Sequence, residues 1–299
     1  MRKLPVIPRK VASLVKEVRK LAGGARRVLV IGSDGAAVGA VKDTLVRGAD
    51  DESAGYLLDT IVMSTDTGLP VSLNGSTGLV ILVAASSELS AGSLSDRLND
   101  VNQAGVPAVL VLSESPGVEL DFPIAGIGPS RVVGMEAGGV VPAGTLTEAV
   151  VDAAGEAAVG LAAQLPALRR EVCRQIIRKT SRQNAVVGAL FFLPGADMPV
   201  MTLNEAKMVL NIAAAHGEKV STERALELLG VVGAGFGLRA LARQALDLLP
   251  GPGWVVKGGV AYSGTRAMGL AAQAYFDGSA RVTPSRLKPL ADRLIQLRG

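Results

Sequence analysis

The sequence has 299 residues and a formal net charge of +4; hydrophobic residues make up 48% of it and aromatic residues 3%. This length is enough for two domains of ordinary size. A single cysteine and a single histidine exclude a disulfide framework and a Cys/His zinc site, so we expect no metal centre. We interpret the histidine, His216, as an exposed residue at a helix end, because Gly217 follows it. The lone thiol of Cys173 fits a reducing, intracellular compartment.

The N-terminal segment predicts a basic amphipathic helix over residues 8–22. Its apolar residues fall on one helical face, its lysines and arginines cover the rest, and Gly23-Gly24 ends it. Such a helix suits two roles: lying on an anionic membrane surface, or docking on its own domain with a solvated basic side. We expect no signal peptide, because no apolar stretch follows the charged N-terminus. We also expect no membrane-spanning helix, because Pro194-Gly195 interrupts the longest apolar run.

The next part of the chain alternates between short apolar runs and helical patterns. The expected strands are residues 27–31, 60–64, 79–84, 108–112 and 131–135, and the expected helices are residues 36–47 and 94–104. Short β-rich runs that alternate with helices are typical of a mostly parallel sheet covered on both faces. The sequence therefore predicts a Rossmann-like α/β domain, in which ligands bind in the loops after the strand carboxyl ends.

A change in composition near Gly144 marks the start of a glycine-rich, all-helical region. Thr145 to Glu148 and Thr202 to Glu205 both have the spacing of a capping box, so each predicts the start of a helix. Pro166 breaks the first of these helices, and the helix after it carries arginines at four-residue spacing. Further helices are expected over residues 222–249, 254–276 and 284–297, the last of them amphipathic.

The glycine-rich turn from Gly32 to Gly39 is the candidate nucleotide site. A phosphate-binding loop needs glycines whose backbone N–H groups surround the phosphates, a lysine for the outer phosphates and a hydroxyl for magnesium. Ala37, Val38 and Gly39 stand where the second glycine, the lysine and the hydroxyl are required, and Asp34 adds a negative charge. The weak candidates for nucleotide contact are Gly32, Ser33, Asp34, Gly35, Gly39, Asp66 and Ser113.

Two further GTPase motifs are degenerate. Asp66-Thr-Gly68 is one residue short of the Asp-x-x-Gly motif, and Ser113-Glu-Ser-Pro116 replaces the guanine-reading Asn-Lys-x-Asp. The first domain resembles Era-like or Ras-like GTPases in the order of its strands and helices, and departs from them at each motif. The resemblance implies a pseudo-GTPase without catalytic residues or a required cofactor, since phosphoryl transfer depends on the missing lysine and metal. A GTP-binding switch with an atypical phosphate loop is the alternative.

The second half carries a second resemblance. The segments concerned are Asn184 to Gly188, Pro194 to Asp197, Pro199, Thr202 with Glu205, Met208, Ile212 to Gly217, Gly264 to Gly269, Ala271 and Tyr275-Phe276. Residues 161–278 resemble the YcjF-like family, bacterial domains of uncharacterised role that often follow an Era-like or dynamin-like GTPase domain. The resemblance implies a hydrophobic, helical, membrane-associated module and no catalytic residues.

Several features of this half also suit contact with lipid. An arginine stripe before an apolar segment can grip anionic head groups, and a tryptophan after a Pro-Gly break can sit at a membrane interface. Gly233 and Gly237 form a small-xxx-small pair that lets helices approach closely. Each feature also fits a soluble bundle, and interspersed charges favour shallow insertion over spanning. The candidate lipid contacts are Arg170, Arg174, Arg178, Arg182, Phe191, Phe192 and Trp254.

These observations predict four regions: a basic helix (1–25), a degenerate GTPase-like α/β domain (26–143), a YcjF-like helical domain (144–279) and a C-terminal amphipathic helix (280–299). We expect a non-catalytic scaffold or regulatory subunit in the cytoplasm, peripheral on the cytoplasmic face of the membrane. Its expected partners are an anionic membrane surface and another protein, such as a GTPase or a second copy. Nucleic acid is not expected, because aromatic residues do not interleave with the basic ones. A soluble oligomeric structural protein is a further alternative.

Overall fold

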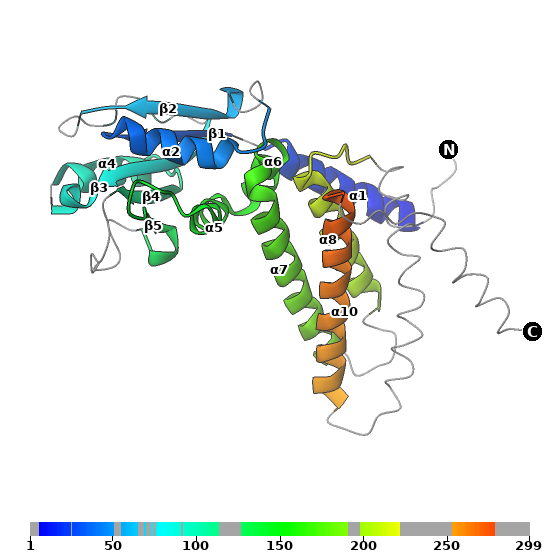
Figure 1. Cartoon of the computed structure of the whole chain (residues 1–299). Coiled ribbons are helices and arrows are strands. Elements are labelled where there is room, and N and C mark those ends of the chain that lie inside the picture. Colours follow the sequence, from blue (N-terminus) through cyan, green and yellow to red (C-terminus); the bar gives the residue numbers. More distant parts are fainter. Residues whose placement is uncertain are drawn as a thin grey trace, which may run out of the picture. The chain divides into compact units, whose positions relative to one another are not determined.

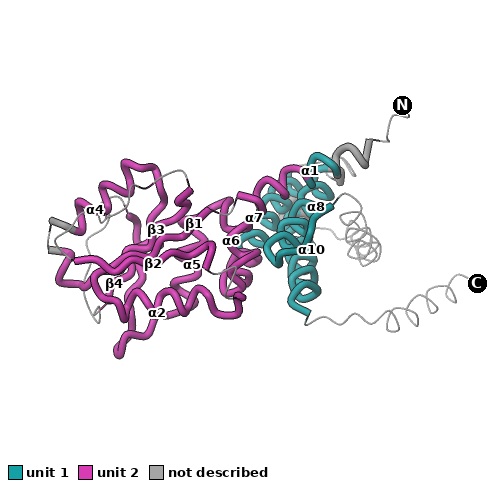
Figure 2. The backbone as a smooth tube through the Cα atoms, turned by 90° about the horizontal axis from the view of Figure 1, so that it is seen from above, with its two compact units in different colours: residues 1–15, 175–299 teal, residues 16–174 magenta. Residues whose placement is uncertain are grey.

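The computed structural model describes residues 6–24, 26–50, 55–64, 69, 73, 76–90, 92–113, 127–190, 198–221 and 253–278. The chain divides into two compact units: residues 16–174, and residues 1–15 together with 175–299 (Figure 2). The helices expected over 222–249 and 284–297, and the pair Gly233 and Gly237, lie outside the described residues.

A five-stranded, all-parallel sheet organises the unit of residues 16–174 (Figure 1). Its strands are β1 (Arg27–Gly32), β2 (Leu58–Val62), β3 (Thr77–Ala85), β4 (Ala108–Ser113) and β5 (Val132–Gly134). Their order in the sheet is β2-β1-β3-β4-β5. This order reverses direction between β1 and β3, as in doubly wound folds of the flavodoxin-like order. The predicted mostly parallel α/β fold is confirmed.

Helices cover both faces of the sheet. They are α2 (Gly35–Val46), α4 (Gly92–Gln103) and α5 (Ala143–Ala154), joined by the 3-10 turns η1 (Ser86–Ser90) and η2 (Pro129–Arg131). Leu94 and Leu98 of α4 share one apolar core with alternate strand residues such as Leu29 and Ile31. Helix α2 contacts β1, β2 and α5, so these two helices lie on the other face. Burial on both faces explains why the strands are continuous apolar runs.

The rest of the described chain is helical, as predicted. Helix α1 (Val6–Ala22) comes first; the others are η3 (Gly155–Ala157), α6 (Ala158–Gln164), η4 (Pro166–Leu168), α7 (Arg169–Leu190), α8 (Met198–Ala215) and α10 (Gly253–Phe276). In α1, Val15 and Val18 are buried while Lys16 and Arg19 are exposed, so its apolar face is packed within the chain. Within the described ranges, no helix is both long and apolar enough to cross a bilayer.

Both predicted capping boxes are wrong, although the helices exist. Helix α5 begins at Ala143 with Pro142 as its N-cap and no side-chain capping bond. Glu148, expected to cap it, instead forms an ion pair with an arginine of α7. Helix α8 begins at Met198, because Pro199 fits the first turn, where a backbone N–H is not needed. Glu205 therefore lies inside the helix, beyond its first turn.

Candidate functional site

The start of α2, where a phosphate would bind, is closed by Asp34. Its Oδ1 accepts hydrogen bonds from the backbone N–H groups of Ala36 (2.8 Å) and Ala37 (3.2 Å). The N–H group of Val38 donates to the Asp34 carbonyl oxygen at 2.9 Å. The first N–H groups of a helix are the ones that hold an anion. Here they converge on a carboxylate of the chain itself.

One glycine of this turn, Gly32, has a packing explanation. Gly32 pairs with Val83 in the parallel β1–β3 ladder. A Cβ atom at Gly32 would lie 2.4 Å from the Val83 carbonyl oxygen and 2.9 Å from its Cβ. A Cβ at Gly35 would make only an ordinary contact with Val62, and one at Gly39 would meet nothing within 4 Å. Gly32 is therefore required by the approach of two strands, whereas packing does not require glycine at positions 35 and 39.

A buried ion pair of Glu88 in η1 with Arg97 in α4 lies beyond the carboxyl ends of β1 and β3, the place that corresponds to the ligand crevice of doubly wound folds. Glu88 is only 7% exposed and Arg97 only 2% exposed. Glu88 Oε1 accepts from the Ser33 hydroxyl at 2.8 Å and from the Ala85 N–H at 3.1 Å. Glu88 Oε2 lies 3.4 Å from Arg97 Nη1. In doubly wound sheets this is the position where ligands bind.

The guanidinium of Arg97 extends the network to the edge strand. Its Nη2 donates to the carbonyl oxygen of Ser64, beyond the end of β2, at 3.3 Å. The pair thus ties together the chain after β1, β2 and β3. A buried charge pair offsets its desolvation only when its remaining hydrogen-bonding groups are satisfied, as these contacts do here.

Ser113, another predicted nucleotide contact, has its polar groups in hydrogen bonds at the end of the sheet. Ser113 is buried at the end of β4, where its hydroxyl donates to the Ala84 carbonyl at 3.4 Å. The Ser113 carbonyl oxygen accepts from the Ser86 hydroxyl at 3.4 Å, so both polar groups form hydrogen bonds with the end of β3 and the residue after it. Asp66 lies outside the described residues. Among the described side chains, no group of three or more His, Cys, Asp or Glu could hold a metal ion.

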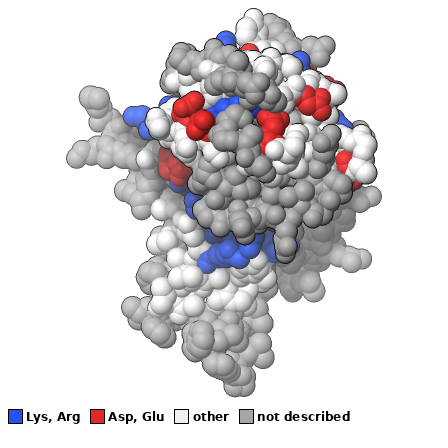
Figure 3. Space-filling view, turned by 90° about the vertical axis from the view of Figure 1, so that its left-hand side faces the viewer, with Lys and Arg blue, Asp and Glu red and all other residues white. Residues whose placement is uncertain are grey.

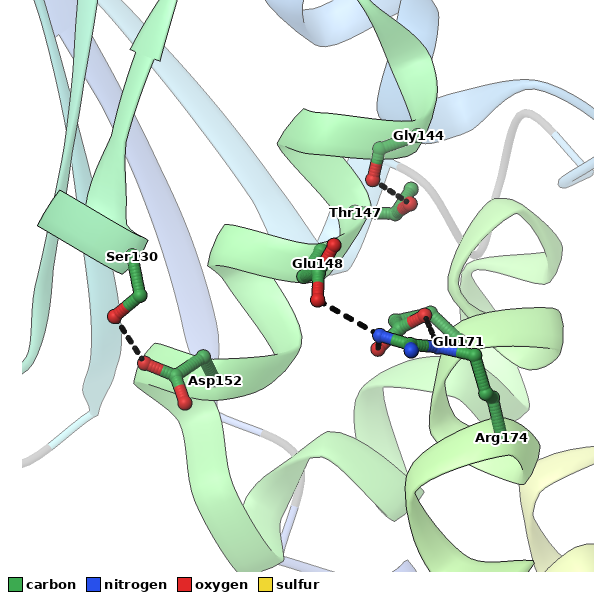
Figure 4. Close-up of polar contacts among 7 residues, drawn as sticks. All are labelled: Ser130, Gly144, Thr147, Glu148, Asp152, Glu171 and Arg174. Atoms are coloured by element: carbon green, nitrogen blue, oxygen red, sulfur yellow. Dashed lines mark hydrogen bonds and ion pairs between the residues drawn. The ribbon is translucent and has the colours of Figure 1, made fainter. Parts of the chain in front are cut away.

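Of the four predicted lipid-binding arginines, Arg174 is engaged elsewhere (Figure 4). Its Nε lies 2.6 Å from Glu171 Oε2, its Nη2 lies 2.7 Å from Glu171 Oε1, and the same Nη2 lies 2.8 Å from Glu148 Oε1. The hydrogen bonds that Arg174 donates to the Glu171 carboxylate raise the pKa of Arg174 above its ordinary range. Arg170 is exposed, as are Arg178 and Arg182.

The arginine stripe continues into an exposed apolar stretch. Val186 and Leu190, which follow Arg182 at the same four-residue spacing, are 57% and 65% exposed. We call Arg178, Arg182, Val186 and Leu190 the outer stripe of α7. Figure 3 shows a side of the molecule on which Lys and Arg side chains gather above an uncharged surface. Phe191 and Phe192, and the side chain of Trp254, lie outside the described residues.

A chain of hydrogen bonds crosses the interior of the helical unit. Asn204 Nδ2 of α8 donates to Asn184 Oδ1 of α7, Asn184 Nδ2 donates to Thr265 Oγ1 of α10, and Thr265 Oγ1 donates to Glu205 Oε1, each at 2.9 Å. We call these four residues the polar chain. Three of them belong to the segments that resemble the YcjF-like family. The residues that carry this resemblance therefore include ones that hold the helices together.

His216 differs from the prediction. It follows the end of α8 as expected, but its side chain is only 5% exposed, so the expectation of an exposed histidine is wrong. Its Nδ1 lies 2.8 Å from the Ile212 carbonyl oxygen and its Nε2 lies 2.8 Å from Asp277 Oδ1. The ring also contacts Phe276, with 5.7 Å between ring centroids. His216 therefore joins the ends of α8 and α10.

Small residues bring α7 and α10 close together. A Cβ atom at Gly269 would lie 2.5 Å from Ile177 Cγ1, and one at Gly258 would lie 3.1 Å from the Ala185 carbonyl oxygen. The order of these contacts shows that the two helices run antiparallel. Glycines of the second half thus permit close helix packing inside one chain.

Sequence reasoning missed Glu88 and Arg97. The available signal was a carboxylate placed three residues after a buried strand, at the loop where an α/β fold binds its ligands. An arginine nine residues further on, within a helix, was the natural partner.

Comparison with protein families gives one match. Residues 153–298 match the family model described as domain of unknown function (DUF697). No GTPase family model matches the α/β region, so the Era-like resemblance is unconfirmed. Comparisons with curated proteins and with solved structures give no match. The chain therefore carries a DUF697 domain over residues 153–298, preceded by an α/β region with a five-stranded parallel sheet.

Proposed function

We propose that the protein is a non-catalytic scaffold or regulatory subunit that attaches to an anionic membrane surface and binds no nucleotide. The observation that carries the proposal is a set of hydrogen bonds and ion pairs within the chain, beyond the carboxyl ends of β1 and β3. The buried Glu88–Arg97 pair and the Asp34 cap take up the groups that a phosphate would need. The α/β unit then serves as a pseudo-GTPase that contacts a partner protein, such as a GTPase.

Electrostatics oppose a phosphate at this place. A phosphate at the start of α2 would have to displace the Asp34 carboxylate from two backbone N–H groups. It would also approach Glu88, a second carboxylate, on the other side of Ser33. Like charges repel most strongly where burial lowers the effective dielectric constant. Nothing in the turn supplies the lysine that offsets this repulsion in phosphate loops.

The outer stripe of α7 supports the membrane part of the proposal. Arg178 and Arg182 present positive charge, and Val186 and Leu190 present apolar surface next to it. Basic residues attract anionic lipid head groups, and apolar residues beside them enter the head-group region.

Calorimetric titration of the full chain with GTP, GDP and ATP, each with magnesium, tests the nucleotide part. We expect no binding heat at millimolar nucleotide. A matched variant, Asp34→Ser, keeps a side-chain oxygen that can cap the helix and removes the negative charge. It separates the contribution of Asp34 from that of Glu88. Micromolar binding to the unaltered protein would refute the proposal and favour a nucleotide switch.

Flotation with phosphatidylserine-containing vesicles tests the membrane part. We expect the protein to float, and the Arg178→Glu/Arg182→Glu variant to float much less. The Lys42→Glu/Lys219→Glu variant makes the same change in net charge at exposed sites outside α7 and should float normally. Equal loss in both variants would contradict the assignment to α7. A protein that stays at the bottom and sediments as one discrete larger species would be a soluble oligomer.

A further inference from the structure

One end of the helical unit buries polar side chains and exposes apolar ones. We call it the inverted end, and it comprises residues 184–190 of α7, 200–205 of α8 and 258–265 of α10. The polar chain joins the three segments, and Gly258 approaches Ala185 closely enough that a Cβ would lie 3.1 Å from its carbonyl oxygen. The three segments are therefore neighbours in space.

Hydrogen-bonded polar groups lie in the interior of this end, beside the buried apolar side chains of Met201 and Ala261. Asn184 and Thr265 are fully buried, and Asn204 and Glu205 are partly buried. Ser181, one turn before Asn184 on α7, is also fully buried, and its Oγ has no hydrogen-bond partner among the described residues.

Exposed apolar side chains lie on the outside of this end, together with the exposed polar residues Thr202 and Ser263. Val186 and Leu190 of α7 and Val200 of α8 are all exposed. On α7 the polar Asn184 faces the interior of the helical unit, while the apolar Val186 faces outward. An aqueous bundle gains stability from the opposite arrangement, with apolar side chains inside and polar ones outside.

Lipid reverses this preference. A helix bundle in contact with lipid keeps its polar groups hydrogen-bonded to one another inside and presents apolar residues to the acyl chains. We infer that the inverted end dips into the interface of an anionic phospholipid bilayer, with Val186, Leu190 and Val200 among the acyl chains. This inference rests on the proposed membrane attachment and adds which end of the helical unit enters the lipid.

The charges of α7 match this orientation. An α-helix rises about 1.5 Å per residue, so Arg182 and Arg178 stand about 6 Å and about 12 Å along the helix from Val186. With Val186 at the depth of about 5–10 Å that interfacial helices reach, both guanidinium groups lie near the lipid phosphates. From Val172 to Leu190 the helix contains no acidic residue, so nothing on it opposes an anionic surface.

The opposite end of the same unit buries apolar side chains beside two polar ones, Asn211 and His216. Its interior residues include Ile212, Met268 and Ala272, which are buried. Leu270 is 49% exposed there, above this apolar interior. Leu270 therefore provides a matched control: an exposed apolar residue of the same helical unit that the inference leaves in water.

The test places an environment-sensitive fluorophore on single cysteines in the full chain. Val186→Cys, Leu190→Cys and Leu270→Cys are labelled in turn; the native Cys173 is buried and does not compete for label. Vesicles of phosphatidylcholine with phosphatidylserine are added, with and without brominated acyl chains. We expect a blue shift and bromine quenching at positions 186 and 190, and neither at 270. In flotation, Val186→Ser/Leu190→Ser should lower partitioning about tenfold, and Leu270→Ser less than about twofold.

The outcomes separate the two levels of the proposal. If the protein floats but the labels at positions 186 and 190 remain in water, insertion of the inverted end is refuted while membrane attachment stands. If the protein does not float, membrane attachment fails and the inference fails with it. If the labels shift with protein concentration in the absence of vesicles, a second copy covers this surface and the lipid assignment is overturned.

Discussion

Gly32→Ala and Gly39→Ala should change stability in opposite directions, although both glycines belong to the turn that resembles a phosphate loop. A methyl group at Gly32 would lie 2.4 Å from the Val83 carbonyl oxygen, about 1 Å inside an ordinary contact. Neither backbone can yield without parting the paired strands, so we expect a loss of about 1–3 kcal/mol or more. At Gly39, within α2, an added Cβ meets nothing within 4 Å. Alanine there should stabilise the helix by about 0.5–1 kcal/mol.

The two variants should therefore differ by about 1.5–4 kcal/mol or more in the free energy of opening the sheet. Because the chain has two compact units, hydrogen exchange of the β1 and β3 amides in urea is a better measure than one global transition. A Gly32→Ala variant with unchanged exchange would refute the packing explanation. A Gly39→Ala variant with faster exchange would show that the turn needs its glycines for another reason.

Three further changes test other contacts. Glu88→Gln should destabilise the sheet by about 3–5 kcal/mol, whereas replacing both Glu88 and Arg97 with methionine should cost much less; sheet amide exchange measures both, and equal losses would contradict a coupled pair. Gly269→Ala should cost about 1–3 kcal/mol through its clash with Ile177, and Ile177→Ala in that background should recover part of the loss; additive effects in urea denaturation would argue against the clash. The pKa of Arg174 is raised in the folded state, so the stabilisation by its charged form is present below the ordinary pKa of arginine and is lost only above it. Arg174→Met removes the guanidinium and should therefore lower the free energy of unfolding equally at pH values from about 7 to about 10. A loss that becomes smaller across this range would contradict a raised pKa.

The fold class followed from the sequence because buried parallel strands leave an unmistakable pattern. The runs RVLVI and LVILVA correspond to β1 and β3, which are buried on both faces. The edge strand β2 was expected at 60–64 and lies at Leu58–Val62. Its alternately exposed residues give a weaker apolar signal, so its bounds were harder to fix.

The site was only partly predictable, because its decisive contacts join distant residues. Asp34 was recognised as a negative charge in the wrong place for phosphate, and its capping bonds are local. The bond between Ser33 and Glu88 spans 55 positions, and that between Asn184 and Thr265 spans 81. Local spacing rules cannot reveal such partners. They also mistook Glu205 for a capping residue, since its true partner, Thr265, belongs to another helix.

Under the proposed function, the carboxylate of Glu88 takes the place of a ligand beyond the carboxyl ends of β1 and β3. A domain that binds a free nucleotide is stabilised by mass action, so its stability follows the concentration of that nucleotide. An occupant fixed to the chain has a constant effective concentration. The α/β unit should then be equally well folded in starved and in growing cells, because its order does not depend on the supply of any metabolite.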